Sequence, residues 1–499
     1  MQGAAGAVQR HGAGPTRRAL WQWTARLGLA GGAATAAGAA AGCGAPALGW
    51  IKRLGREPVE VDVLVGSPSL VGALEPAVAA VNGSDGVYRL RLHRLPAPPM
   101  AGPADRGPRG APAAQGMPSP ADATQAWPAA AAEPQDTTSP DSPILAGARA
   151  AQAAGAAAII AVDGSSDLAV MAMDGLVQAL QPPAADGPAR EWAAGIAPGA
   201  LEGLRLRGTL HGLPLGVTVE LLEYDPRLFE AAGLARPERR KRDGWMWRDF
   251  LDAARRLTGA GAGGDATGQL GLLSPGSLSS WVWQAGGDVV SQDGRRSPLA
   301  EARAVEAFIF YEQVHRAGVT GRAGDRGGRG YTYTPQGLRL GDAGGPRVAM
   351  NVGRVMPAGR PQWWPLRVAE LPRLRSSATS VRVASALAIL AGTTPPEPAY
   401  GATITLASAA QRHLVTPARV PTPAELRERS TGGAGLWEES EVQAYVASLR
   451  YGRSLPLVPD DGIRAIMADI VSRLLAGGEH TPPRAAREGA MAIERLLNS

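Results

Sequence analysis

The 499-residue sequence has a single cysteine, Cys43, and only two lysines, Lys52 and Lys241. One cysteine excludes an internal disulfide, and a lone thiol gives little support for a metal site. Neither lysine follows a suitable glycine run, which excludes the lysine-containing phosphate loop of nucleotide-binding proteins. The six histidines are scattered singly, without the spacing of metal ligands. The sequence therefore predicts no metal site and no bound cofactor.

Beyond its first 42 residues the chain also lacks an excess of one charge. Its formal net charge is +6, but Arg10, Arg17, Arg18 and Arg26 lie in the first 42 residues, which contain no acidic residue. The rest of the chain is nearly neutral and has no field for phosphate backbones, so we expect no nucleic-acid partner. Catalytic motifs are absent as well, since no serine lies in a Gly-x-Ser-x-Gly elbow. The glycine-rich residues 259–264 follow a predicted helix rather than a strand, which argues against a dinucleotide site. We therefore expect a protein that is not an enzyme.

The segment before Cys43 has the features of an export signal. The pair Arg17–Arg18 precedes a mildly apolar stretch, Leu27–Ala41, and small residues come directly before Cys43. This order is typical of a secretory signal peptide, and paired arginines indicate the twin-arginine route. Small residues before a cysteine indicate a lipobox, although Ala40 stands where leucine is commonest. The alternative, a transmembrane anchor, is disfavoured because the stretch is shorter than a span of roughly 20 apolar residues.

These features predict how the start of the chain is processed and where the protein is found. We predict a signal peptide at 1–42, lipidation of Cys43 and a tether at 43–58. The mature protein would then be extracytoplasmic, held by a lipid anchor to the outer face of the cytoplasmic membrane.

Strand and helix patterns alternate after the tether. Valine at every second position of residues 59–65 predicts a strand, followed by a helix over Ser69–Val81 and a strand over Tyr88–Leu92. Another helix and strand are predicted within 144–162. Between them, residues from about 96 to 143 are rich in alanine and proline, which predicts disorder. The β-α-β order predicts an α/β layer architecture.

Several motifs occur in an order that is specific as a set, although each is weak alone. They are Tyr224–Gly233 (YDPRLFEAAG), Trp247–Phe250 (WRDF), Trp283–Asp288 (WQAGGD), Val348–Gly353 (VAMNVG) and Ser380–Ile389 (SVRVASALAI). In type and order these motifs resemble those of the extracytoplasmic solute-binding proteins of ABC importers. The resemblance is to the carbohydrate-binding group related to maltose-binding protein, and it covers about residues 59–499 apart from the low-complexity stretches at about 96–143 and 318–330.

This resemblance implies a two-lobed, periplasmic-binding-protein-like α/β fold of type II, with hinge strands and an interlobe cleft. We expect lobe 1 at 59–216 and 371–425. Lobe 2 is expected at 217–370, with a flexible stretch at about 318–330, and at 426–499.

The implied function is capture of a small-molecule solute, a sugar or oligosaccharide, by lobe closure and its delivery to the permease of an ABC transporter. We expect a monomer. Two alternatives stay open: a secreted carbohydrate-active enzyme, and a solute-sensing lipoprotein that is not coupled to import.

The resemblance also places the ligand near several polar and aromatic residues. Trp281 is the first stacking candidate, because Trp281 and Trp283 would share one face of an extended segment and an aromatic ring can lie against a sugar. The expected hydrogen-bonding partners are Asp163, Glu220, Asn351 and Arg354. The remaining candidates are Ser165, Trp363, Trp364, Ser385 and Arg453. Helix capping is an equally good explanation for Asp163 and Ser165, as is core packing for any one tryptophan.

Overall fold

The computed structural model describes fifteen stretches of the chain. They are residues 58–84, 87–95, 142–155, 158–180, 188–237, 245–259, 268–320, 331–341, 345–355, 364–393, 396–414, 416–422, 424–426, 437–476 and 480–498. The predicted signal peptide, Cys43, nearly all of the predicted disordered insertion, residues 321–330 and Trp363 lie outside these stretches.

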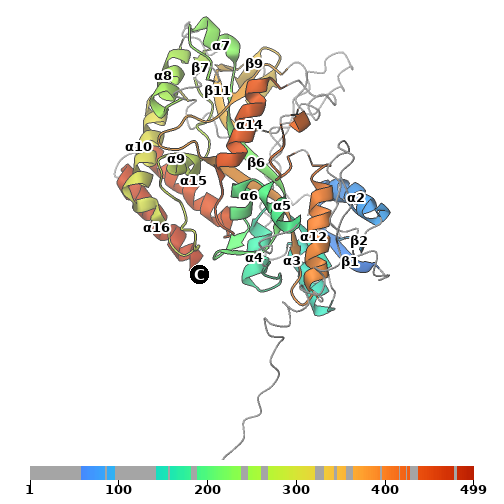
Figure 1. Ribbon diagram of the computed structural model, residues 1–499. Helices are drawn as coiled ribbons and strands as arrows, with labels where there is room; N and C mark the ends of the chain where they lie inside the picture. The colour runs from blue at the N-terminus through green and yellow to red at the C-terminus, as the bar shows by residue number, and fades with distance from the viewer. Residues whose placement is uncertain are drawn as a thin grey trace, which may run out of the picture. The chain divides into compact units, whose positions relative to one another are not determined.

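Helices and strands alternate along most of the chain (Figure 1). The helices are α2 (Pro68–Gly83), α3 (Pro143–Ala153), α4 (Ser166–Met173), α5 (Pro188–Ala194), α6 (Pro198–Glu202), α7 (Pro226–Ala231), α8 (Trp247–Leu257), α9 (Leu278–Gln284), α10 (Ala302–Arg316), α12 (Pro396–Ala410), α14 (Glu439–Tyr451), α15 (Asp460–Ala476) and α16 (Pro482–Leu497). The strands are β1 (Val59–Val65), β2 (Tyr88–Arg94), β3 (Ala158–Asp163), β4 (Arg205–Leu206), β5 (Thr209–Leu210), β6 (Leu213–Tyr224), β7 (Gln269–Leu270), β8 (Tyr331–Thr334), β9 (Gly337–Leu340), β10 (Arg347–Val348), β11 (Met350–Val355), β12 (Arg367–Ala369), β13 (Thr379–Ile389) and β14 (Gly452–Arg453).

One eight-stranded sheet runs through the molecule in the order β11-β6-β13-β3-β1-β2, with β12 paired to β6 and β14 to β13. The strands β1, β2 and β3 pair in parallel, as expected for strands connected by helices. The long strands β6 and β13 pair antiparallel to one another. Strand β13 also pairs with β3 of the parallel part, and β6 also pairs with β11 on its other side. The predicted α/β class is confirmed.

Two large hydrophobic cores lie along this sheet. The first core contains β3, β13, α6 and α14, and the second core contains α8, α9, α10, α15 and α16. Strand β6 serves both, because Val217 and Val219 are buried in the first core whereas Leu222 and Tyr224 are buried in the second. Strand β6 therefore runs from one core into the other.

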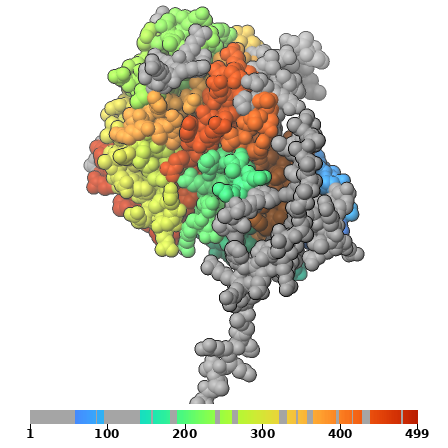
Figure 2. Space-filling view, in the orientation of Figure 1, coloured from blue at the N-terminus to red at the C-terminus, as the bar shows by residue number. Residues whose placement is uncertain are grey.

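The C-terminal part of the chain divides between these cores. Helix α14 packs in the first core, on β12, β6 and α6, although the expected boundary at residue 425 would place it in the second lobe. The change of core falls at Leu457, in the first, and Val458, in the second. In Figure 2 the orange-red surface of α14 adjoins the teal-green surface of residues near 200. The exact lobe boundaries stay a prediction.

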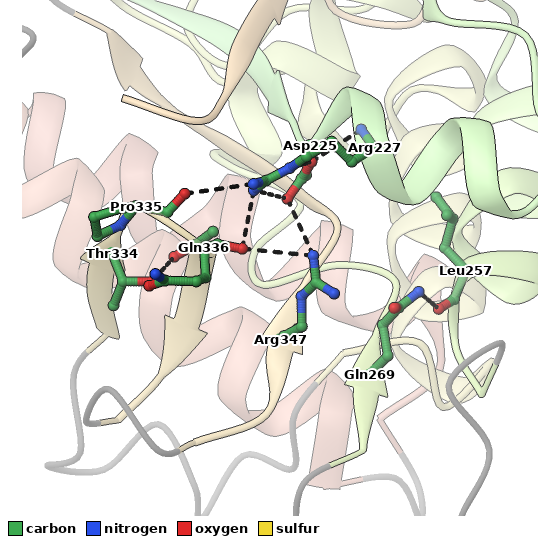
Figure 3. Close-up of polar contacts among 9 residues, drawn as sticks. Asp225, Arg227, Leu257, Gln269, Thr334, Pro335, Gln336 and Arg347 are labelled. Atoms are coloured by element: carbon green, nitrogen blue, oxygen red, sulfur yellow. Dashed lines mark hydrogen bonds and ion pairs between the residues drawn. The ribbon is translucent and has the colours of Figure 1, made fainter. Parts of the chain in front are cut away.

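A small third core carries a separate four-stranded sheet, ordered β7-β10-β9-β8. Figure 3 shows how this sheet is attached to α7. The wholly buried carboxylate of Asp225 accepts hydrogen bonds from Arg227 N at 3.0 Å and from Arg227 Nη2 at 2.8 Å, and it lies 3.6 Å from Arg347 Nη2. Arg227 Nη2 also donates to the carbonyl of Gln336 at 2.9 Å, in the β8–β9 turn. Asp225 therefore caps α7 and fixes the hairpin at the same time.

Candidate functional site

A cavity of about 350 Å³ lies between segments of the two cores. Its walls come from the start of α9, the strands β11 and β13, residues 454–456 and one side of α15, with Ser165 at the start of α4. Its polar lining consists of Ser165, Ser277, Ser279, Ser380, Ser454, Tyr311, Trp283, Arg354, Arg382, Arg464 and Asp460. Hydroxyl and guanidinium donors thus surround a space large enough for a small polar molecule.

The strands that cross between the cores supply a polar face to this cavity. Register places Arg354 opposite Glu220 and Arg382 opposite Thr218, so these four side chains share one face of the sheet. Arg354 Nη1 donates to Thr218 Oγ1 at 3.1 Å, and among the described residues no carboxylate lies within ion-pair distance of Arg354. Most of its guanidinium donors are therefore available at the cavity wall.

Glu220 holds the opposite wall in place rather than lining the cavity. Its buried carboxylate accepts hydrogen bonds from Ser277 N at 3.2 Å, from Ser277 Oγ at 2.8 Å and from Ser280 Oγ at 2.7 Å. These donors stand at the start of α9, so the carboxylate satisfies a backbone N–H that the helix leaves without an internal partner. Glu220, expected to bind the ligand directly, instead has its carboxylate hydrogen-bonded to the start of α9 in this structure.

Ion pairs join β13 to the start of α15 at the cavity. Arg382 lies 3.5 Å from both Asp460 and Asp461. Arg464, one turn along α15, pairs with the same two carboxylates. The positive charges of the two arginines are therefore matched by the negative charges of the two aspartates at the α15 wall of the cavity. Sequence reasoning missed this group, because β13 and α15 are far apart in the chain and no motif contains both.

Trp281 and Trp283, the two tryptophans of α9, have different environments. They lie in a helix, α9, instead of the expected extended segment, and helical residues two positions apart point in different directions. Trp281 is 0% exposed, packs against Trp247, Phe250 and Phe310, and donates its indole N–H to Pro275 O at 2.8 Å. The expectation that Trp281 stacks on a ligand is therefore corrected. Trp283 does line the cavity.

The loop after β3 brings two carboxyl groups together near Ser165. Burial raises the pKa of Asp167 to about 6, a hydrogen bond from Ser142 Oγ at 3.2 Å opposes this shift, and the charge of Asp163 adds to it. Burial also raises the pKa of Asp163, while a hydrogen bond from Ser67 lowers it. Neither carboxyl lines the cavity, whereas Ser165 does. Asp167 was not named as a ligand-binding candidate, although its position just after a buried strand marks this loop as part of a possible site.

The other expected residues make contacts elsewhere. Asn351 is buried and donates to Glu223 Oε2 at 3.2 Å, and Ser385 is buried opposite Asp163 in the β3–β13 pair. The Trp364 ring packs on Tyr333, with ring centroids 4.1 Å apart, in the small third core. Arg453 contacts Glu202 and Asp288 beside the cavity. The remaining expected residue, Trp363, lies outside the described residues.

No group of three or more metal-ligating side chains is present within the described stretches. In the same part of the chain, no helix has the length and apolar character needed to span a bilayer.

Residues 137–331 match the family of bacterial extracellular solute-binding proteins. No match was found among curated proteins. The resemblance inferred from the sequence motifs, to extracytoplasmic solute-binding proteins, is confirmed over these residues.

Solved structures similar to this chain share its fold at low sequence identity. The cyclic α-maltosyl-1,6-maltose-binding protein of Arthrobacter globiformis is 16% identical, with a TM-score of 0.58 and coverage of 89% of this chain and 100% of that one. An ABC substrate-binding protein of Listeria monocytogenes in complex with cycloalternan is 15% identical, with a TM-score of 0.54 and coverage of 89% and 100%. A family 1 extracellular solute-binding protein of Alicyclobacillus acidocaldarius is 15% identical, with a TM-score of 0.56 and coverage of 89% of this chain and 100% of that one. The predicted two-lobed, periplasmic-binding-protein-like fold is thereby confirmed.

Proposed function

We propose that this chain, which over residues 137–331 matches the bacterial extracellular solute-binding proteins, captures a solute outside the cytoplasm by closing two lobes around it. The solute is a sugar or oligosaccharide, and the loaded protein delivers it to the permease of an ABC transporter. The chain acts as a monomeric binding protein, not as an enzyme, and needs no cofactor.

The observation that carries this proposal is the cavity between the two cores. Its walls offer hydroxyl and guanidinium groups beside the aromatic ring of Trp283 and apolar side chains such as Leu278 and Met467. This combination is complementary to a sugar, whose C–H faces pack on aromatic or apolar groups and whose hydroxyls need polar partners.

The balance of charge at the cavity favours a neutral solute. Arg382 and Arg464 are matched by Asp460 and Asp461, so these groups do not demand a charged ligand. Arg354, half-buried at the wall, can donate hydrogen bonds to sugar hydroxyls without requiring a negative charge. The solved relatives named above include proteins whose ligands are cyclic oligosaccharides, which supports the same substrate class.

The N-terminal sequence supports the proposed location. A twin-arginine signal and a lipidated Cys43 would keep the mature protein at the outer face of the cytoplasmic membrane, where permease subunits are accessible.

A thermal-shift panel on the mature protein tests the function. Sugars, oligosaccharides, polyols, amino acids and glycerol phosphates are compared with buffer, because a ligand that binds only the folded state raises the melting temperature. We expect stabilisation by a neutral sugar, and a reduced effect in Arg354→Gln. Stabilisation by a non-carbohydrate alone would contradict the substrate class, and release of product from a stabilising glycan would favour an enzyme.

A further inference from the structure

Arg453 contacts both cores with one guanidinium group. Its Nη2 atom donates to Glu202 Oε1 at 2.8 Å and to Asp288 Oδ2 at 3.1 Å. Glu202 is the last residue of α6, which packs in the first core, and Asp288 precedes Val289 of the second core. Arg453 itself lies in β14, which pairs with the start of β13. The contact therefore bridges segments that the crossing strands would let move apart.

The same group is connected to two walls of the cavity. The Arg453 guanidinium lies over the Trp283 ring, 5.7 Å from its centroid, and Trp283 Nε1 donates to Asp288 Oδ1 at 2.8 Å. On the other side, Ser454 N donates to Glu202 Oε2 at 3.3 Å, and residues 454–456 form part of the lining. Loss of this contact would therefore change the positions of the Trp283 ring and of residues 454–456, both of which line the cavity.

The charges make this contact more than an ordinary surface ion pair. One cation lies between two carboxylates, whose contacting oxygens are within about 6 Å of one another because both contact the same nitrogen. The three side chains are 24–30% exposed, so solvent screens them only in part. Removing the arginine would leave two negative charges facing one another across the boundary of the cores.

From this geometry we propose that Arg453 is an interlobe latch, joining Glu202 and Asp288 so that the lobes stay in the arrangement that forms the cavity. The effect on solute affinity rests on the function proposed above, whereas the effect on lobe movement does not. Arg453, expected from the sequence to contact the ligand, acts instead as a positioning residue for Trp283 and residues 454–456.

Distance measurements between spin labels test the latch without any ligand. Labels are attached to Ala153→Cys in α3 and Met491→Cys in α16, both exposed, in the full chain carrying Cys43→Ser so that no other thiol reacts. We expect Arg453→Gln to lengthen and broaden the label distance. Arg453→Lys, which keeps a cation between the two carboxylates, should restore most of the original distribution. The matched control is Arg450→Gln, an exposed arginine near the end of α14 that lies three positions before Arg453 in the sequence.

Affinity for a stabilising sugar gives the second measurement. If loss of the latch lowers the binding-competent fraction to about a tenth, the dissociation constant rises about tenfold. Glu202→Gln should give a smaller change in the same direction, and the double variant Glu202→Gln, Arg453→Gln should bind no more weakly than Arg453→Gln alone. An unchanged label distance in Arg453→Gln, or an equal change in Arg450→Gln, would overturn the latch. Failure of every sugar to bind the wild type would instead count against the proposed function.

Discussion

Ser280 Oγ donates a 2.7 Å hydrogen bond to the buried carboxylate of Glu220, which joins α9 to the crossing strand β6. The same hydroxyl accepts a hydrogen bond from Ser380 N at 2.9 Å, in β13. Two crossing strands and the helix that begins one cavity wall thus meet at a single side chain. The first turn of α9, which forms part of the cavity wall, is therefore fixed to both crossing strands through Ser280.

Removal of the Glu220 carboxylate should destabilise the fold. In Glu220→Ala the buried donors of Ser277 and Ser280 lose their acceptor, and we expect the free energy of unfolding to fall by about 2–4 kcal/mol. Urea denaturation measures this change. Glu230→Ala, at an exposed helix position, is the control and should stay within about 0.5 kcal/mol of the wild type. Equal losses in the two variants would contradict the role assigned to Glu220.

Loss of the Arg354 side chain should weaken solute binding without unfolding the protein. Its guanidinium lines the cavity and has one described protein acceptor, Thr218 Oγ1. A hydrogen bond from a charged donor contributes about 1.5–3 kcal/mol, so Arg354→Gln should raise the dissociation constant of a bound sugar at least about tenfold. Titration calorimetry measures it, with the exposed Arg495→Gln as the control. Unchanged affinity in Arg354→Gln would remove this residue from the site.

The two tryptophans of α9 should separate stability from binding. Trp281 is buried among aromatic rings, so Trp281→Phe should lower the free energy of unfolding by about 2 kcal/mol and leave sugar affinity within about twofold. Trp283 lines the cavity, so Trp283→Phe should weaken binding by about five- to tenfold. Denaturation and calorimetry on the same samples give both quantities. A reversed pattern would show that Trp281, not Trp283, meets the ligand.

Stability should depend on pH through Asp167. Its pKa in the folded protein is about 6, above the usual 3.8, so the folded state favours the protonated carboxyl. The buried charge destabilises the fold at pH 7–8, and this penalty disappears as the pH falls through 6 toward 4. Asp167→Asn should therefore stabilise the protein by about 1–2 kcal/mol at pH 8 and have little effect at pH 4.

Urea denaturation at five pH values between 4 and 8 checks this dependence. The exposed Asp252→Asn serves as the matched control and should show no such dependence. A stabilisation by Asp167→Asn that is the same at pH 4 and pH 8 would show that the carboxyl is not ionised in a buried site.

The lipid anchor should depend on Cys43. We expect Cys43→Ser to move the mature protein from the membrane fraction to the soluble extracytoplasmic fraction, because a serine hydroxyl cannot carry the thioether-linked lipid. Fractionation and detergent partitioning in an export-competent bacterial host measure this. A Cys43→Ser variant that stays with the membrane as firmly as the wild type would rule out the anchor.

Local pattern was sufficient for much of the fold. The alternation of valines at 59–65 predicted β1, and the helical spacing of 69–81 predicted α2, because one buried face imposes its period on the sequence. The motifs from Tyr224 onward indicated the solute-binding family because each is a short local sequence pattern, and the family match at residues 137–331 covers the first three of them.

Only the tertiary structure decided which residues meet. The tryptophan-rich segment could be assigned to the cavity region from sequence, but its helical form and the burial of Trp281 depend on packing against α8 and α10. Arg382 and Asp460 lie 78 positions apart and became neighbours through the placement of α15 on β13. Arg453 likewise contacts Glu202 and Asp288 because the two cores lie close together at β14. Periodicity records which face of an element is buried, whereas the partner on that face is set by long-range packing that no local pattern encodes.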